Sequence, residues 1–144
     1  MTMPMAKSIA PNRRVGRSIG AVFVGFIAVA ILSLVTDQVL HVLRVYPPWG
    51  QPMFEPSLNV LALAYRIIFT ILGGYITARL APYAPMRHAL ALGLIGLATA
   101  TAGAVVTITK YDLGPDWYPI ALAVTALPCT LLGALPYDVR QRRR

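Results

Sequence analysis

A lone cation within an apolar run is the residue with the most informative chemistry in this sequence. Arg66 has Glu55 and Arg79 as its nearest charged neighbours along the chain. A guanidinium within lipid is costly unless it meets a counter-charge, a water-filled cavity or a neighbouring helix. Arg66 therefore predicts either an intramembrane ion pair or a site for a small anion.

Asp37 is the candidate partner because the two residues lie at matching depths. Asp37 comes eight residues before Val45, and Arg66 comes eight residues after Leu58, which are the edges of the first outer loop. At about 1.5 Å per residue, both would lie roughly 12 Å beneath the outer boundary on adjacent antiparallel helices. The sequence thus predicts an Asp37 and Arg66 pair that is either structural or lines a cavity.

Alternatives to this pairing remain open. The 19 uncharged residues from Ser18 to Thr36 already make about 28 Å of helix, which would let Asp37 emerge near the outer headgroups. His41, one turn from Asp37, and Glu55, in the loop, are alternative partners. An arginine beside Asp37 would keep its carboxylate ionised, which disfavours a proton carrier. His41 and His88 are interpreted as interfacial polar groups at opposite rims.

Composition places these residues in a membrane protein. The 144-residue chain is 57% hydrophobic and only 12% charged, which is outside soluble globular usage and fits one domain. The net charge is +8, and the basic residues lie at chain ends and turns rather than along one stripe. Membrane topology therefore explains their positions better than nucleic-acid binding does. Cys129 is the only cysteine, which excludes a disulfide framework within one chain.

The elements that must position the polar residues are four transmembrane helices. Each apolar segment is long enough to cross about 30 Å of hydrocarbon. Short loops predict an all-α, antiparallel up-down bundle in which each helix neighbours the next. Pro128 is expected to kink the last helix. The expected spans are 18–45, 58–80, 86–108 and 117–135, with basic tails at 1–17 and 137–144.

Orientation follows from the basic residues. Arg44 and Lys110 lie on one side, and ten of the 13 lysines and arginines lie on the other. The positive-inside rule then predicts both termini in the cytoplasm, where the basic tails would meet anionic lipids. The ten are Lys7, Arg13, Arg14, Arg17, Arg79, Arg87, Arg140, Arg142, Arg143 and Arg144.

Small residues three or four apart on the third span form a ridge that permits close helix approach. They are Gly93, Gly96, Ala100 and Ala104, with Ala89 beyond them. Packing within the chain is the default interpretation, and a homo-oligomer through this face is an alternative. The loop Tyr46 to Ser57 contains four prolines and is expected to form an ordered cap.

The motifs of membrane enzymes are missing from the sequence. It contains no GxSxG, no HExxH, no clustered carboxylates for magnesium and no second cysteine for redox work. We therefore expect a non-enzymatic protein with no cofactor and no bound metal.

Several strings resemble those of a group of small, uncharacterised bacterial inner-membrane proteins with four helices. They are TDQVLH, VYPPWGQPM, AYRIIFTILGGYITARLAP, PMRHALALGLIG and GPDWYPIALAVTALP. The resemblance covers most of Ile19 to Leu135 and implies a bacterial inner-membrane location, but no activity or ligand. It implies that the group's pattern includes Asp37, His41, Tyr65, Arg66, Arg79, Arg87 and His88.

These observations favour an accessory or assembly protein with a polar site formed by Asp37, Arg66, His41 and Tyr65. The alternative is an oligomeric transporter or channel for a small solute or anion, in which Arg66 and Asp37 face a cavity. A third possibility is a lipid-binding module that uses the outer cap. A transporter needs a water-accessible pocket that reaches Arg66, whereas an accessory protein should have this region closed.

Overall fold

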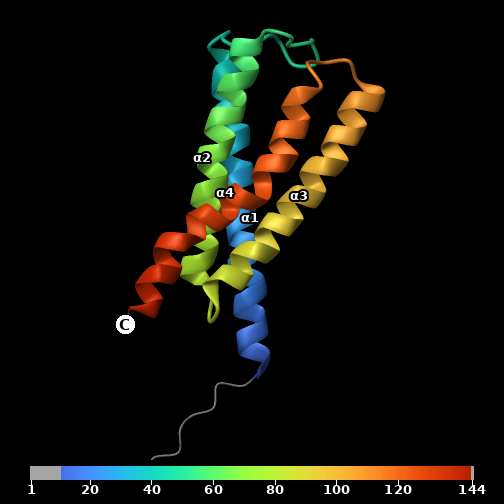
Figure 1. Ribbon diagram of the computed structural model, residues 1–144. Helices are drawn as coiled ribbons and strands as arrows, with labels where there is room; N and C mark the ends of the chain where they lie inside the picture. The colour runs from blue at the N-terminus through green and yellow to red at the C-terminus, as the bar shows by residue number, and fades with distance from the viewer. Residues whose placement is uncertain (1–10, 144) are drawn as a thin grey trace, which may run out of the picture.

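The protein is a bundle of four helices, α1 (Pro11–Val42), α2 (Pro56–Leu80), α3 (Pro85–Lys110) and α4 (Trp117–Arg142) (Figure 1). The computed structural model describes residues 11–143, and no strand occurs within that range. All four helices are long and apolar enough to cross a membrane. The predicted all-α fold with four spans is therefore confirmed, and the chain is a multi-pass membrane protein.

Local sequence explains most of the helix ends. Pro56 and Pro85 begin α2 and α3, where the missing N–H removes no helical hydrogen bond. α1 ends at Val42, three residues earlier than predicted, and the chain reverses through Arg44 at φ 59°. A positive φ is uncommon for a residue other than glycine and cannot continue a right-handed helix.

α4 is longer than the sequence predicts. It runs to Arg142, past the expected end at Leu135, so the predicted carboxy-terminal tail continues as helix. Pro128 and Pro136 both lie inside it, and α4 bends along its length (Figure 1). Each proline removes one backbone hydrogen bond, which permits bending without ending the helix when the flanking turns stay packed.

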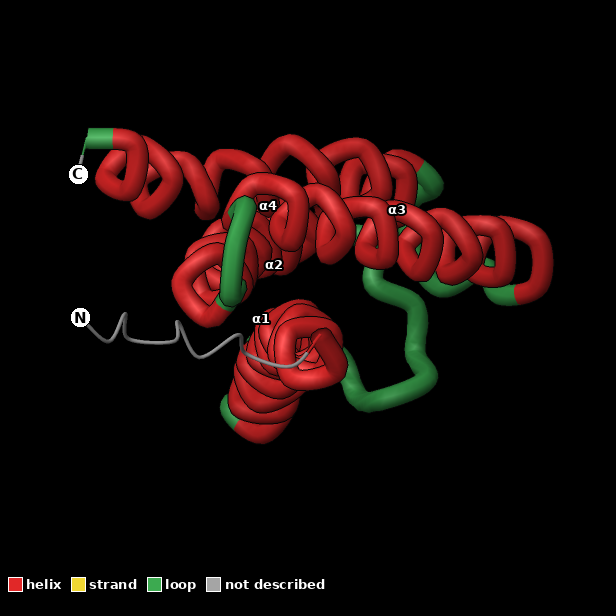
Figure 2. The backbone as a smooth tube through the Cα atoms, turned by 90° about the horizontal axis from the view of Figure 1, so that it is seen from below, coloured by secondary structure: helices red, strands yellow, loops and turns green. Residues whose placement is uncertain are grey.

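The neighbour relations differ in part from the sequential order that we predicted. α1 packs on α2 and α3 on α4, but the contact between α2 and α3 is slight, and α2 packs most extensively on the parallel helix α4. Among the described residues α1 makes no contact with α4. Viewed from below, α2 lies between α1 and α4 (Figure 2).

Glycines allow α2 to pack closely on α4. A Cβ atom at Gly74 would lie 2.1 Å from the carbonyl oxygen of Thr130, and one at Gly133 would lie 1.9 Å from that of Ile71. Any residue with a Cβ atom at these positions would hold the two backbones farther apart. Gly25 makes a similar approach between α1 and α2, where an added Cβ would lie 2.9 Å from the carbonyl oxygen of Gly73.

The ridge on α3 is used within the chain. A Cβ at Gly93 would lie 2.7 Å from the side chain of Leu127, and one at Gly96 would lie 3.7 Å from that of Ala126, so both glycines face α4. Ala104 is buried, and Ala100 lines a cavity. The homo-oligomer through this face stays a prediction.

The two ends of the bundle differ in charge. The start of α1, the turn between α2 and α3 and the end of α4 lie at one end, which carries Arg79, Arg87 and Arg140 (Figure 1). Arg44 and Lys110 lie at the other end. Lys7 and Arg144 lie outside the described residues.

Candidate functional site

The predicted ion pair is present where α1 packs on α2. An Nη2 hydrogen of Arg66 is donated to Oδ2 of Asp37. The Asp37 side chain is 9% exposed and that of Arg66 is 26% exposed, so the contact is largely shielded. Each charge therefore has its counter-charge on the neighbouring helix, as their equal depths led us to expect.

Tyr65 satisfies the second oxygen of the carboxylate. Its hydroxyl donates to Oδ1 of Asp37, and the hydroxyl of Tyr46 lies 3.5 Å from that of Tyr65 and 3.4 Å from the carbonyl oxygen of Leu58. Burial raises the pKa of the Tyr46 phenol, which keeps it a neutral donor at physiological pH. Both oxygens of Asp37 thus accept a hydrogen bond.

Arg66 reaches a third helix through its other terminal nitrogen. Nη1 donates to the hydroxyl of Tyr118, near the start of α4. The guanidinium carbon lies 5.7 Å from the ring centroid of Tyr65 and 5.9 Å from that of Tyr118, within cation–π range. Because the backbones of α1 and α4 lie apart in the described residues, Arg66 provides a polar link between them. We call Asp37, Tyr65, Arg66 and Tyr118 the charged network.

His41 lies beside the charged network and supports the outer loop. Its Nδ1 is 2.7 Å from the backbone carbonyl oxygen of Asp37, and its ring stacks on Trp49 with centroids 3.9 Å apart and planes 3° apart. Trp49 Nε1 also donates to Gln38 Oε1 at 3.3 Å. His41 is therefore not the partner of the Asp37 carboxylate.

Glu55 forms no ion pair with Arg66 in the described residues, and its carboxylate accepts a hydrogen bond from Ser57 at 3.1 Å. The loop is instead fixed by Asn59, which is buried. Its amide donates to the carbonyl oxygens of Met53 at 2.8 Å and Glu55 at 2.9 Å. The loop is an ordered cap above the charged network.

Two cavities meet at Arg66. The outer cavity, about 210 Å³, lies beneath the cap and is lined by Asp37, His41, Trp49, Tyr65 and Arg66 among others. The inner cavity, about 230 Å³, is lined by residues of all four helices, including the polar Ser33, Arg66, Thr70, Thr99 and Thr130. Each could hold several waters, since a water occupies about 30 Å³ in the liquid.

Tyr118 and Tyr46 are the site residues that sequence reasoning missed. The sequence pattern singled out neither of them as a partner for the buried charges. The outer start of α4 lies lower than that of α2 (Figure 1), so Tyr118, one residue into α4, meets Arg66, ten residues into α2. A buried tyrosine hydroxyl usually has a hydrogen-bond partner, so both phenols could have been considered as partners for the buried charges.

Other chemistry is limited in the described part of the chain. Within residues 11–143, no group of three or more His, Cys, Asp or Glu side chains could hold a metal ion. Cys129 is buried and has no cysteine partner there.

No protein-family model matches the sequence, and no match was found among curated proteins or among solved structures.

Proposed function

We propose that the protein is a non-enzymatic accessory or assembly protein of the bacterial inner membrane, in which the charged network holds three helices in register. One observation carries this proposal. Both oxygens of Asp37 and both terminal nitrogens of Arg66 are already occupied by side chains of the same chain. The two charges are therefore compensated within the chain, which leaves no unpaired charge here to attract a substrate ion.

Complete satisfaction of polar groups supports a structural role. Among the described residues, every buried side-chain nitrogen and oxygen has a hydrogen-bond partner. Removing one member of a buried ion pair typically costs about 3–5 kcal/mol, because the remaining charge is left uncompensated. A pair of this kind discriminates strongly against any other register of α1 on α2.

The proposed placement rests on the basic end of the bundle. Arginines outnumber acids there, and the positive-inside rule assigns such an end to the cytoplasm. Both termini would then be cytoplasmic, and the basic tails would face anionic lipids. The resemblance to small bacterial four-helix proteins supports an inner-membrane location.

A second candidate is an oligomeric transporter or channel for a small solute or anion. The two cavities on either side of Arg66 favour it, because a solute pathway must reach this cation from both directions. In that arrangement the contacts of Arg66 with Asp37 and Tyr118 would have to open during transport. The ion pair of Arg66 with Asp37, and not closure of the region, favours the accessory role over this one.

Anion flux into proteoliposomes distinguishes the two functions. The purified protein would be reconstituted, and uptake of chloride, nitrate and phosphate would be measured beside Arg66→Gln and the control Arg87→Gln. The accessory role predicts that all three proteins give the flux of protein-free vesicles. Saturable flux that is lost in Arg66→Gln and kept in Arg87→Gln would overturn it in favour of a transporter.

A further inference from the structure

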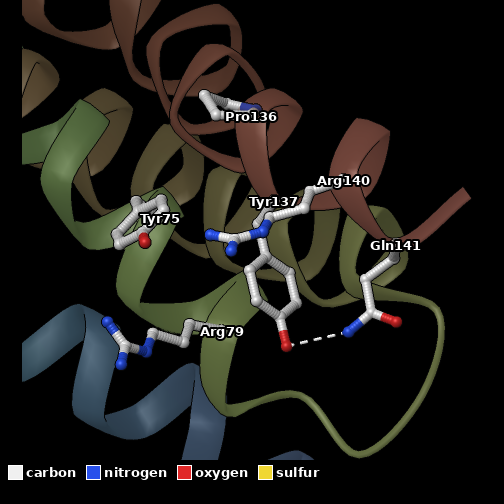
Figure 3. Close-up of a pocket in the computed structure, with 6 residues that line it drawn as sticks. All are labelled: Tyr75, Arg79, Pro136, Tyr137, Arg140 and Gln141. Carbon is white, nitrogen blue, oxygen red and sulfur yellow. Dashed lines mark hydrogen bonds between the residues drawn. The ribbon is translucent and has the colours of Figure 1, made fainter. Parts of the chain in front are cut away.

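A separate polar cavity lies at the opposite, basic end of the bundle. It has a volume of about 480 Å³ and opens between the lower parts of α2 and α4. Its lining combines two arginines with two phenols, and none of these residues belongs to the charged network. They are Tyr75, Arg79, Pro136, Tyr137, Arg140 and Gln141 (Figure 3).

The side chains in this cavity are arranged around one cation. The guanidinium of Arg140 lies between the rings of Tyr75 and Tyr137, whereas the Arg79 side chain extends away from Tyr137, below Tyr75 (Figure 3). The two rings meet edge to face with centroids 6.5 Å apart, and Gln141 donates to the Tyr137 hydroxyl at 2.9 Å. The cavity therefore has ordered walls and several polar groups.

Neither arginine is neutralised by the part of the chain that the structure describes. The two ion pairs there join Arg66 to Asp37 and Arg142 to Asp138, at 2.8 Å in the second case. Asp138, the nearest acid in sequence, is thus already engaged. Two uncompensated guanidinium groups that line one cavity can bind the oxygens of a phosphate, which arginine contacts with paired N–H donors.

An apolar track leads from the cavity toward the middle of the bundle. Ile68 and Leu72 lie on α2 at helical spacing from Tyr75 and Arg79, and Leu132 lies on α4 four residues before Pro136. Ile68 is 61% exposed, Leu72 40% and Leu132 54%. A ligand with a charged head and apolar tails fits these two regions together.

We propose that this cavity binds the headgroup phosphate of an anionic glycerophospholipid through Arg79 and Arg140, with acyl chains along Ile68, Leu72 and Leu132. The inference rests on the proposed placement of the basic end at the headgroups and is independent of the accessory role. Free phosphate has the same chemistry as the headgroup but has no apolar part that could contact the apolar track.

Native mass spectrometry can test this on the full chain. Wild-type protein and variants would be released from vesicles of equal phosphatidylglycerol and phosphatidylcholine, and the lipids that remain bound would be counted. The test variant is Arg79→Gln with Arg140→Gln. The matched control is Arg13→Gln with Arg87→Gln, which removes the same charge from the same end.

We expect wild type and the control to retain phosphatidylglycerol over phosphatidylcholine by about tenfold or more, and the test variant to lose this preference. Equal loss in the two variants would overturn the site in favour of diffuse charge attraction. Displacement of the lipid by millimolar inorganic phosphate would overturn the choice of a lipid as ligand.

Protein stability must be measured alongside lipid binding. Arg79 and Arg140 are exposed, so the test variant is expected to unfold in lipid-free detergent at the temperature of the control. If the test variant unfolds earlier without lipid, the arginines stabilise the fold directly and the lipid site is contradicted. Neither result depends on anion flux, so the lipid site and the accessory role can fail separately.

Discussion

Arg66 donates to Asp37 on α1 and, through its other terminal nitrogen, to Tyr118 on α4, two helices that make no other described contact. The half of the bundle beneath the cap is thus joined by polar side chains. The lower half is joined by glycine contacts, which begin on α2 at Gly73, seven residues below Arg66. The two halves are stabilised by different interactions and should respond to different substitutions.

The hydroxyls of the two phenols in the charged network should contribute to stability. Tyr65→Phe removes a donor to Asp37, and Tyr118→Phe removes the acceptor for Arg66. Each should lower the free energy of unfolding by about 0.6–1.7 kcal/mol, the range for hydrogen bonds between membrane helices. Unfolding in detergent measures this, with the exposed Tyr111→Phe as control. Equal stability of all three variants would contradict the network.

Glycines at the α2 and α4 crossing should tolerate no side chain. Gly74→Ala and Gly133→Ala each place a methyl group within about 2 Å of a backbone oxygen on the other helix, so the helices must separate. We expect a loss of about 1–3 kcal/mol in each case. Gly103→Ala, with open space around the new Cβ, should not destabilise. A melting temperature for Gly74→Ala equal to that of Gly103→Ala would show that the crossing is looser than described.

Asn59 should control the order of the cap. Asn59→Ala removes both hydrogen bonds to the carbonyl oxygens of Met53 and Glu55. Since neutral hydrogen bonds contribute about 0.5–1.5 kcal/mol each, the cap should open more often. Chymotrypsin cleavage after the exposed Phe54 should then accelerate, whereas Gln51→Ala, at an exposed position, should leave the rate unchanged. Identical rates in the two variants would refute this role of Asn59.

Much of the fold follows from the sequence, because lipid leaves few options for apolar segments of this length. The spans, their alternating direction and the pairing of Asp37 with Arg66 could all be predicted. The last of these needed only two helices of equal depth joined by one loop. The prediction was correct because the relative depth of two residues on adjacent helices can be counted from the loop that joins the helices.

Relations between distant helices could not be predicted in this way. Counting from loop edges assumes that all outer ends are level, but α4 begins lower than α2 (Figure 1). Tyr118 therefore meets Arg66 although their distances from the helix starts differ. The close packing of α2 on α4 depends on Gly74 and Gly133 facing one another, which the spacing within either helix alone does not show.

The structural role of the ion pair is the central claim, and a double-mutant cycle tests it most directly. Unfolding free energies in detergent would be measured for wild type, Asp37→Leu, Arg66→Leu and the double variant. We predict single losses of about 3 kcal/mol or more, with a double variant more stable than either single one, because no buried charge is then left alone. Losses that simply add, or single variants as stable as wild type, would contradict the claim.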